Sequence, residues 1–115
     1  MRAAMASEAK TVAAEAVAER ERVLRILREQ APTLRARGIA SLSLFGSMAR
    51  GEAAPKSDVD LLIETDPGSR FGLSDLLDLQ EDLGKLLARP INFAFGSEMR
   101  PWLRAWIEDD RIEIF

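Results

Sequence analysis

The chain has 115 residues, which is enough for one domain whose core removes roughly 65% of the unfolded chain's surface from water. It contains no cysteine and no histidine, and this excludes disulfides, nucleophile systems that depend on histidine and zinc sites with histidine ligands. The net charge of −3 argues against a protein that coats DNA or RNA, and no apolar run reaches the roughly 20 residues of a membrane-spanning helix. We therefore expect a cytoplasmic protein that binds neither membranes nor nucleic acid directly, with chemistry carried by carboxylates, hydroxyls, lysine and arginine.

The first quarter of the chain predicts a helix over residues 8–30, because it is rich in alanine, glutamate and arginine. Apolar side chains recur in it at spacings near three and four: Val12, Ala16, Val23, Ile26 and Leu27. The apolar character strengthens in the second half, so we divide the chain into a helical extension over residues 1–20 and one domain over residues 21–115. Pro32 and Gly38 are expected to end the helical region.

Two strands are predicted in the middle of the chain. The first covers residues 39–45, ends at Gly46 and is followed by a short helix in the segment "SMARGE". A loop, "APKS", then leads to the second strand, "DVDLLIE", over residues 58–64. Asp58 and Asp60 alternate with apolar residues along this strand, so their side chains are expected to leave the same face.

The last part of the chain again alternates helix and strand. Leucines at helical spacing predict the buried face of a helix over residues 73–87: Leu73, Leu76, Leu77, Leu83 and Leu87. The segment "RPINFAF" predicts a third strand, and Ser97 is expected to cap a final helix that has Pro101 in its first turn. We assign Trp102 and Trp106 on that helix to packing against the core or a partner rather than to stacking on a base. The closing "RIEIF" fits either a strand or a tail.

The elements follow one another as helix, strand, short helix, strand, helix, strand, helix and a last strand or tail. Such alternation indicates an α/β (α+β) domain in which helices flank a small sheet. The sequence shows no internal repeat, low-complexity tract or linker, so the domain is treated as one unit.

Asp58 and Asp60 form a candidate metal site. Their Cα atoms lie about 6.6 Å apart on a strand, so the two carboxylates can converge on one hard cation or on a pair. Two-metal phosphoryl-transfer sites hold their ions roughly 3.5–4 Å apart, and Mg²⁺ completes its coordination with water and phosphate. The alternative interpretation of this pattern is a pair of solvated surface carboxylates.

The residues just before the aspartates are suited to phosphate. Gly46 allows a tight turn, and the Ser47 hydroxyl together with the N–H groups at the start of the short helix can hold an anion. Arg50 lies one helical turn further on, and Lys56 and Ser57 directly precede the aspartates. The stretch thus combines an anion site with a cation site, which a nucleoside triphosphate bound with Mg²⁺ requires.

The stretch "GSMARGEAAPKSDVD" resembles the nucleotidyltransferase signature of the DNA polymerase β superfamily, a Gly-Ser pair followed by ten residues and then Asp-x-Asp. The longer segment "LFGSMARGEAAPKSDVDLLIE" is similar to the minimal nucleotidyltransferase (MNT) domains of bacteria and archaea. The similarity continues through "FGLSDLLDLQEDLGKLLARPINF" and "MRPWLRAWI", from about residue 21 to the C-terminus.

The resemblance implies a nucleotidyltransferase fold, with a small mixed sheet, that binds ATP with Mg²⁺ and transfers the nucleotidyl group. It implies that Asp58 and Asp60 hold Mg²⁺, two ions in an active enzyme, and that Gly46 and Ser47 hold the β- and γ-phosphates. Many MNT proteins are encoded beside a HEPN-domain toxin, a ribonuclease, which they neutralise by AMPylation of a tyrosine or by binding. The HEPN partner of this chain is expected to be a separate protein.

One position departs from the family pattern. The family's third carboxylate comes from the next strand, where the run "RPINF" places Asn92. Asparagine can offer a carbonyl oxygen to a cation but cannot accept a proton as a base. Glu64 shares the face of Asp60, but four strand residues separate the two by about 13 Å, which is too far for Glu64 to substitute.

Two functions therefore stay open. The chain is either a Mg-dependent antitoxin that transfers AMP from ATP to its HEPN partner, or a weakened or inactive relative that neutralises the partner by binding only. Modification of a small molecule, as in aminoglycoside nucleotidyltransferases, is a weaker third alternative, because no second domain for a sugar substrate is expected. The sequence leaves the nucleotide, the acceptor group and the oligomeric state open.

Overall fold

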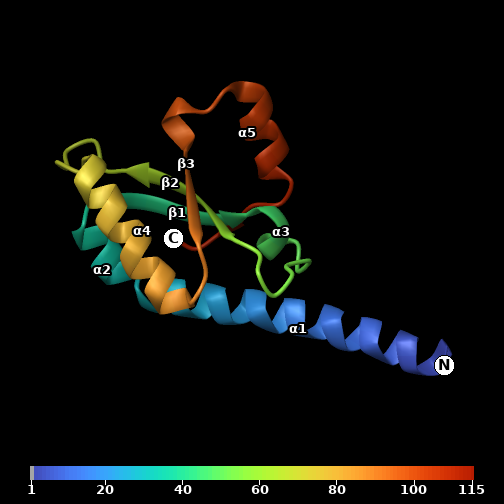
Figure 1. Ribbon diagram of the computed structural model, residues 1–115. Coiled ribbons are helices and arrows are strands. Elements are labelled where there is room, and N and C mark those ends of the chain that lie inside the picture. The colour runs from blue at the N-terminus through green and yellow to red at the C-terminus, as the bar shows by residue number, and fades with distance from the viewer. Residues whose placement is uncertain (1) are drawn as a thin grey trace.

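The computed structural model describes the backbone of residues 2–115 and the side chains of residues 13–115. Its elements are, in chain order, α1 (Arg2–Glu29), α2 (Ala31–Ala36), β1 (Ile39–Phe45), α3 (Gly46–Ala49), β2 (Val59–Thr65), α4 (Leu73–Leu87), β3 (Ile91–Phe95), the short 3-10 helix η1 (Gly96–Glu98), α5 (Pro101–Glu108) and β4 (Ile112–Glu113). The molecule measures 59 × 31 × 20 Å, because α1 extends well beyond the sheet (Figure 1). Within the described part of the chain, no helix combines the length and the apolar character needed to span a membrane.

Four strands form one mixed sheet in the order β3-β2-β1-β4. Strand β1 runs antiparallel to both β2 and β4, whereas β2 and β3 are parallel. Parallel neighbours need a crossover connection, and α4 supplies it. The predicted α/β fold with a small mixed sheet flanked by helices is confirmed.

The two faces of the sheet have different environments. Val59, Leu61 and Ile63 alternate along β2 and are buried in a core to which α1 and α4 also contribute. Asp60 and Glu64 are half-buried on the opposite face. Figure 1 shows α1 and α4 on one side of the strands and α5 on the other. The predicted metal ligands therefore lie on the sheet face that the main core does not cover.

Helix α1 begins earlier than predicted and continues without a break across residue 20, where we place the start of the domain. Ala16, Val23 and Leu27 of its predicted apolar stripe are buried. Val12, the first member of that stripe, lies outside the described side chains. The sheet is thus covered by the second half of the helix, as its stronger apolar pattern indicates.

A second short helix, α2, follows where the sequence predicts the end of the helical region. Pro32 lies in its first turn. Proline lacks an N–H group, but the N–H groups of a first turn have no partner within the helix, so proline is tolerated there. The prediction that Pro32 ends the helical region is therefore wrong. Gly38, with a φ of 102°, ends it as predicted.

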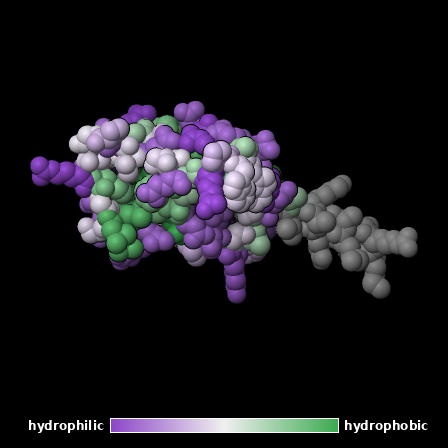
Figure 2. Space-filling view, turned by 90° about the horizontal axis from the view of Figure 1, so that it is seen from above, coloured by the Kyte–Doolittle hydropathy of each residue, from purple (hydrophilic) through white to green (hydrophobic). Residues whose placement is uncertain are grey.

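Helix α4 buries only part of the predicted stripe: Leu83 and Leu87 are in the core as predicted. Leu79, Leu83 and Leu87 are buried, whereas Leu73 and Leu77 are 72% and 55% exposed. Side chains two positions apart on a helix point about 200° apart around its axis, so Leu77 and Leu79 face opposite sides. The prediction that Leu73 and Leu77 belong to the core is wrong. Figure 2 shows apolar surface at the end of the molecule where Figure 1 places the start of α4.

The final helix begins at a different residue from the predicted cap. Ser97 lies in η1, and Arg100 is the residue before α5, so the prediction that Ser97 caps this helix is wrong. Pro101 occupies the first turn as predicted and holds Arg100 in an extended conformation. Trp102 and Trp106 are 67% and 66% exposed, so the prediction that they pack in the core is wrong, while packing against a partner stays a prediction. Within the segment "RIEIF", Ile112 and Glu113 form a short strand, β4, that pairs with β1.

Candidate functional site

Asp58, Asp60 and Asn92 meet on the sheet face that the main core does not cover. Asp58 directly precedes β2, and Asp60 is the second residue of that strand. Asn92 lies opposite Asp60 in the parallel register of β2 and β3. The Asn92 Nδ2 group donates hydrogen bonds to Asp58 Oδ2 at 2.9 Å and to Asp60 Oδ1 at 3.2 Å. One amide group therefore holds the two carboxylates together.

The oxygen atoms of this trio fit a hard divalent cation. Carboxylate and amide oxygens are ligands of Mg²⁺, which takes water and phosphate oxygens for the rest of its shell. Asp58 and Asp60 would hold the ion, and Asn92 would turn its amide so that Oδ1 rather than Nδ2 faces it, because the amide nitrogen only donates. Among the residues that the structure describes, no group of three carboxylate, histidine or cysteine side chains is placed to hold a metal. A cation bound here would therefore have two carboxylate ligands, Asp58 and Asp60.

Gly46 brings the turn after β1 against Asp60. Its φ of 76° lies in the left-handed region, and a Cβ atom at this position would overlap Asp60 Oδ2. Both the turn and the carboxylate therefore require glycine here. The helix that begins at Gly46 is a single four-residue turn and adds only a small dipole, so phosphate binding would depend on the Ser47 hydroxyl and nearby N–H groups.

Arg50, at the end of α3, is paired with two carboxylates. Its Nε donates to Glu52 Oε2 at 2.9 Å, and its Nη1 donates to Asp110 Oδ2 at 2.8 Å. Hydrogen bonding to Glu52, and then to Asp110, raises the pKa of Arg50 above its ordinary value. Arg50 would have to exchange one of these carboxylates for a phosphate in order to contact a nucleotide.

Lys56 and Ser57 lie in the loop between α3 and β2. The Ser57 Oγ accepts a hydrogen bond from Ala54 N at 2.7 Å, and Ser57 N donates to Ala54 O at 3.0 Å. The Ser57 hydroxyl therefore shapes the turn that leads to Asp58. Lys56 is exposed on the same loop. The contacts of Lys56 and Ser57 with a nucleotide stay predictions.

A cleft of ≈ 320 Å³, which we call the α3–α5 cleft, separates α3 from α5. Its lining comes from the β1–α3 turn, β2 and the last helix: Phe45, Gly46, Ser47, Arg50, Asp60, Trp106, Ile107 and Asp110. Three of the predicted nucleotide-binding residues therefore share one cleft with a predicted metal ligand. The sequence analysis missed the contribution of Trp106, Ile107 and Asp110. The four-residue spacing of Trp106 and Asp110 is the only local sign of a shared face.

Comparison with known proteins identifies the family. The model of the nucleotidyltransferase domain matches residues 20–114. The chain belongs to the nucleotidyltransferase domain family. Two similar proteins are the putative protein adenylyltransferases MJ1379 and MJ0435 of Methanocaldococcus jannaschii. MJ1379 is 34% identical over 66% of this chain and 77% of its own length. MJ0435 is 30% identical over 77% of this chain and 94% of its own length.

Solved structures share the fold of this nucleotidyltransferase domain. A putative minimal nucleotidyltransferase is 36% identical, with a TM-score of 0.64 over 77% of this chain and 90% of its own. A toxin–antitoxin structure with AMP-PNP is 15% identical, with a TM-score of 0.62 over 76% of this chain and 72% of that one. A complex of tri-AMPylated Shewanella oneidensis HEPN toxin with MNT antitoxin is 13% identical, with a TM-score of 0.56 over 80% of this chain and 71% of that one. The predicted resemblance to minimal nucleotidyltransferases is confirmed.

In this nucleotidyltransferase domain, Arg89 fixes the loop that leads to Asp58. Its Nη1 donates to Ser57 O at 2.8 Å and to Ala54 O at 3.2 Å, and its Nε donates to Glu19 Oε1 at 2.9 Å. The Arg89 side chain is only 12% exposed, so its bonds to Ser57 and Glu19 are partly shielded from water. Arg89 therefore ties the loop to helix α1.

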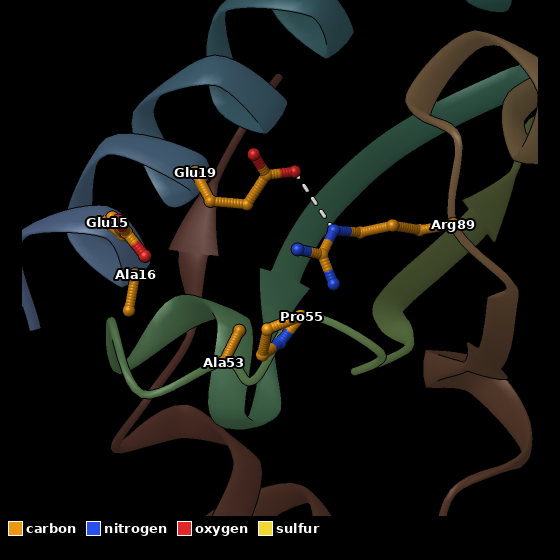
Figure 3. A pocket seen from close by; sticks show the side chains of 6 residues that line it. All are labelled: Glu15, Ala16, Glu19, Ala53, Pro55 and Arg89. Carbon is orange, nitrogen blue, oxygen red and sulfur yellow. Dashed lines mark hydrogen bonds and ion pairs between the residues drawn. The ribbon is translucent and has the colours of Figure 1, made fainter. Parts of the chain in front are cut away.

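Glu19 is the acidic centre of this network. Figure 3 shows Glu19 and Arg89 pointing toward one another beside a pocket that Ala53 and Pro55 also line. Arg22, one turn along α1, donates from its Nε to Glu19 Oε2 at 3.0 Å. Hydrogen bonding to Arg22, and then to Arg89, lowers the pKa of Glu19 from 4.5 to about 2, although burial opposes the shift.

We expect Glu19→Gln to lower the free energy of unfolding at neutral pH by about 1–2 kcal/mol, because the partly exposed carboxylate is screened by water. The Glu19 pKa is lower in the folded chain than in the unfolded chain. Its contribution is therefore complete above pH 4.5 and is lost as the pH falls toward 2. Urea denaturation across this range should show the difference between wild type and variant shrinking.

Glu21→Gln is the matched control for this prediction, because Glu21 forms an exposed pair with Arg20 on the same helix. Exposed pairs contribute little to stability, so this variant should match the wild type at every pH. A Glu19→Gln difference that stays constant between about pH 5 and pH 2.5 would contradict the prediction.

Proposed function

We propose that this chain is an antitoxin that binds ATP with Mg²⁺ and transfers AMP to a hydroxyl group of a HEPN-domain toxin. The observation that carries the proposal is the position of Asp60, which stands in one cleft with Gly46 and Ser47 and is joined to Asp58 through Asn92. The proposal is supported by the relatives that are putative protein adenylyltransferases. It is also supported by the tri-AMPylated HEPN toxin in the complex that shares this fold.

The transfer is a single displacement. An acceptor hydroxyl oxygen forms a bond to the α-phosphorus, the bond from that phosphorus to the oxygen bridging to the β-phosphate breaks, and pyrophosphate leaves with the electron pair. The hydroxyl proton passes to water or to a carboxylate. Bound Mg²⁺ would neutralise the charge that develops on the phosphates. Asp58 and Asp60 would hold the ion, and the Gly46–Ser47 turn would orient the phosphates.

Asn92 favours a second candidate function, in which the protein neutralises its partner by binding without transfer. An amide cannot accept the hydroxyl proton, whereas a third carboxylate could. General-base catalysis typically contributes about 10²–10⁴-fold to a rate, so a site without the third carboxylate can retain nucleotide binding while transfer becomes negligible.

A labelling experiment tests transfer. The purified chain is incubated with its HEPN partner, Mg²⁺ and α-labelled ATP, and the label on the partner is measured. We expect label with the wild type and none with the double variant Asp58→Asn/Asp60→Asn, because the amides hold the cation poorly. If wild type and double variant label the partner equally, the transfer does not occur at this site.

Asn92→Asp separates the two candidate functions in the same experiment. Label with the wild type would establish that Asn92 is compatible with transfer. Label with Asn92→Asp alone would favour the binding-only function, provided that the wild type still suppresses the ribonuclease activity of the partner. Absence of label with both proteins would overturn transfer to this partner.

A further inference from the structure

Helix α5 carries two tryptophans that differ in their surroundings. Trp102 and Trp106 are 67% and 66% exposed, so about two thirds of each side chain lies in water. Trp106 lines the α3–α5 cleft together with Gly46 and Ser47, whereas Trp102 is not among the residues of that cleft. Trp102 is therefore a matched control for Trp106, because the two side chains have the same chemistry and exposure but only Trp106 lines the cleft.

The packing of α5 does not require the Trp106 indole. The helix is anchored by Ile107, the next residue, which is only 5% exposed. A large exposed aromatic ring in a cleft is a surface on which a planar ligand can stack, and base–aromatic stacking is a common way to hold a nucleotide. The ring is therefore available for a ligand in the cleft.

Three side-chain hydrogen bonds hold α5 in place beside the cleft. Near the end of the helix, Asp110 accepts a hydrogen bond from Arg50 Nη1 at 2.8 Å, which joins it to α3. On the helix itself, Arg104 donates from Nη1 to Gly96 O at 3.0 Å and from Nη2 to Glu64 Oε1 at 3.4 Å. Trp106 lies between these contacts in the sequence, so its backbone position is set before any ligand binds.

The two walls of the cleft have different chemistry. The wall formed by Gly46, Ser47 and Asp60 carries polar groups suited to phosphates and a cation. The opposite wall carries the indole of Trp106 and the side chain of Ile107, together with Asp110, whose carboxylate is paired with Arg50. Figure 1 shows α3 and α5 at the same end of the sheet. A nucleoside triphosphate has a similar division, with a charged phosphate chain at one end and a planar aromatic base at the other.

We propose that Trp106 stacks on the nucleobase of the nucleoside triphosphate in the α3–α5 cleft. This inference rests on the proposed nucleotide-binding function and differs from our sequence-based interpretation of Trp106 as packing against the core or a partner. Every base offers a π-face, so stacking contributes affinity without selecting one base. Trp106 would therefore strengthen the binding of ATP and GTP alike.

The test compares three variants by calorimetry with three probes in Mg²⁺: ATP, GTP and inorganic tripolyphosphate, which has no base. Trp106→Ala should weaken ATP and GTP on the order of 10- to 100-fold and leave tripolyphosphate within about twofold. Trp106→Phe should recover most of the loss, because it restores an aromatic face. Trp102→Ala should bind all three probes like the wild type. Quenching of the Trp106 fluorescence by ATP, absent in Trp106→Ala, gives a second readout.

The outcomes separate this inference from the function on which it rests. If the wild type binds neither ATP nor tripolyphosphate, both the nucleotide-binding function and the stacking role are overturned. If ATP binds the wild type and Trp106→Ala equally, stacking alone is overturned. A parallel loss of tripolyphosphate and ATP affinity in Trp106→Ala would also overturn stacking, because it would show that the substitution disturbs the phosphate wall.

Discussion

Asn92→Asp is expected to make the stability of the fold depend on a divalent cation. In the wild type, the Asn92 amide donates to Asp58 and to Asp60 at 2.9 and 3.2 Å. The substitution replaces this donor with a third carboxylate at hydrogen-bond distance from the other two. Two hydrogen bonds are lost and like charges meet, so without divalent cation we expect the free energy of unfolding to fall by about 1–3 kcal/mol.

Addition of Mg²⁺ should reverse this loss, because three carboxylates hold a cation better than two and binding to the folded state stabilises it. Denaturation followed by circular dichroism, with EDTA and with Mg²⁺, measures both effects. AMP transfer to the partner should rise in the same variant by roughly 10²–10⁴-fold if the missing base limits the wild-type rate.

Asn92→Ala is the control, since it removes the amide without adding charge. It should lose stability in EDTA and gain little from Mg²⁺. If Asn92→Asp responds to Mg²⁺ no more than Asn92→Ala does, the three side chains do not form a cation site.

Gly46→Ala is expected to damage both the fold and the site. The φ of 76° at Gly46 is strained for any residue with a Cβ atom, and the added Cβ would overlap Asp60 Oδ2. Strain and displacement of Asp60 together should lower the free energy of unfolding by roughly 2–4 kcal/mol. Affinity for ATP in Mg²⁺, measured by calorimetry, should fall at least about tenfold, because Asp60 is a proposed ligand of the cation.

Gly51→Ala isolates the backbone part of this effect. Gly51 has a similar φ of 70°, but an added Cβ would meet the flexible Arg20 side chain at 3.2 Å rather than a site carboxylate. We expect a loss of about 1 kcal/mol and unchanged ATP affinity. Equal losses in the two variants would show that the contact between Gly46 and Asp60 has no role in the site.

Local patterns predicted the main elements of this chain well. Periodicity and turn residues predict the three main strands, the long helices and the short helix after Gly46. The predicted ends lie within a few positions of the observed ones, except at the start of α1. The errors occur where local sequence is ambiguous. Leu73 and Leu77 share a helical spacing with the buried leucines, yet only the position of α4 on the sheet decides which stripe is covered.

The sequence by itself determined the chemical groups of the site and the family, because the Gly-Ser and Asp-x-Asp signature is short and contiguous. The tertiary structure decided how those groups meet. Asn92 bonds Asp58 across 34 positions, and Asp110 bonds Arg50 across 60. Such contacts depend on the order of strands in the sheet and on the placement of α5, which no local periodicity encodes. For this reason the spacing of two aspartates indicated a cation site, while the bridging amide and the indole in the cleft became visible only in the folded chain.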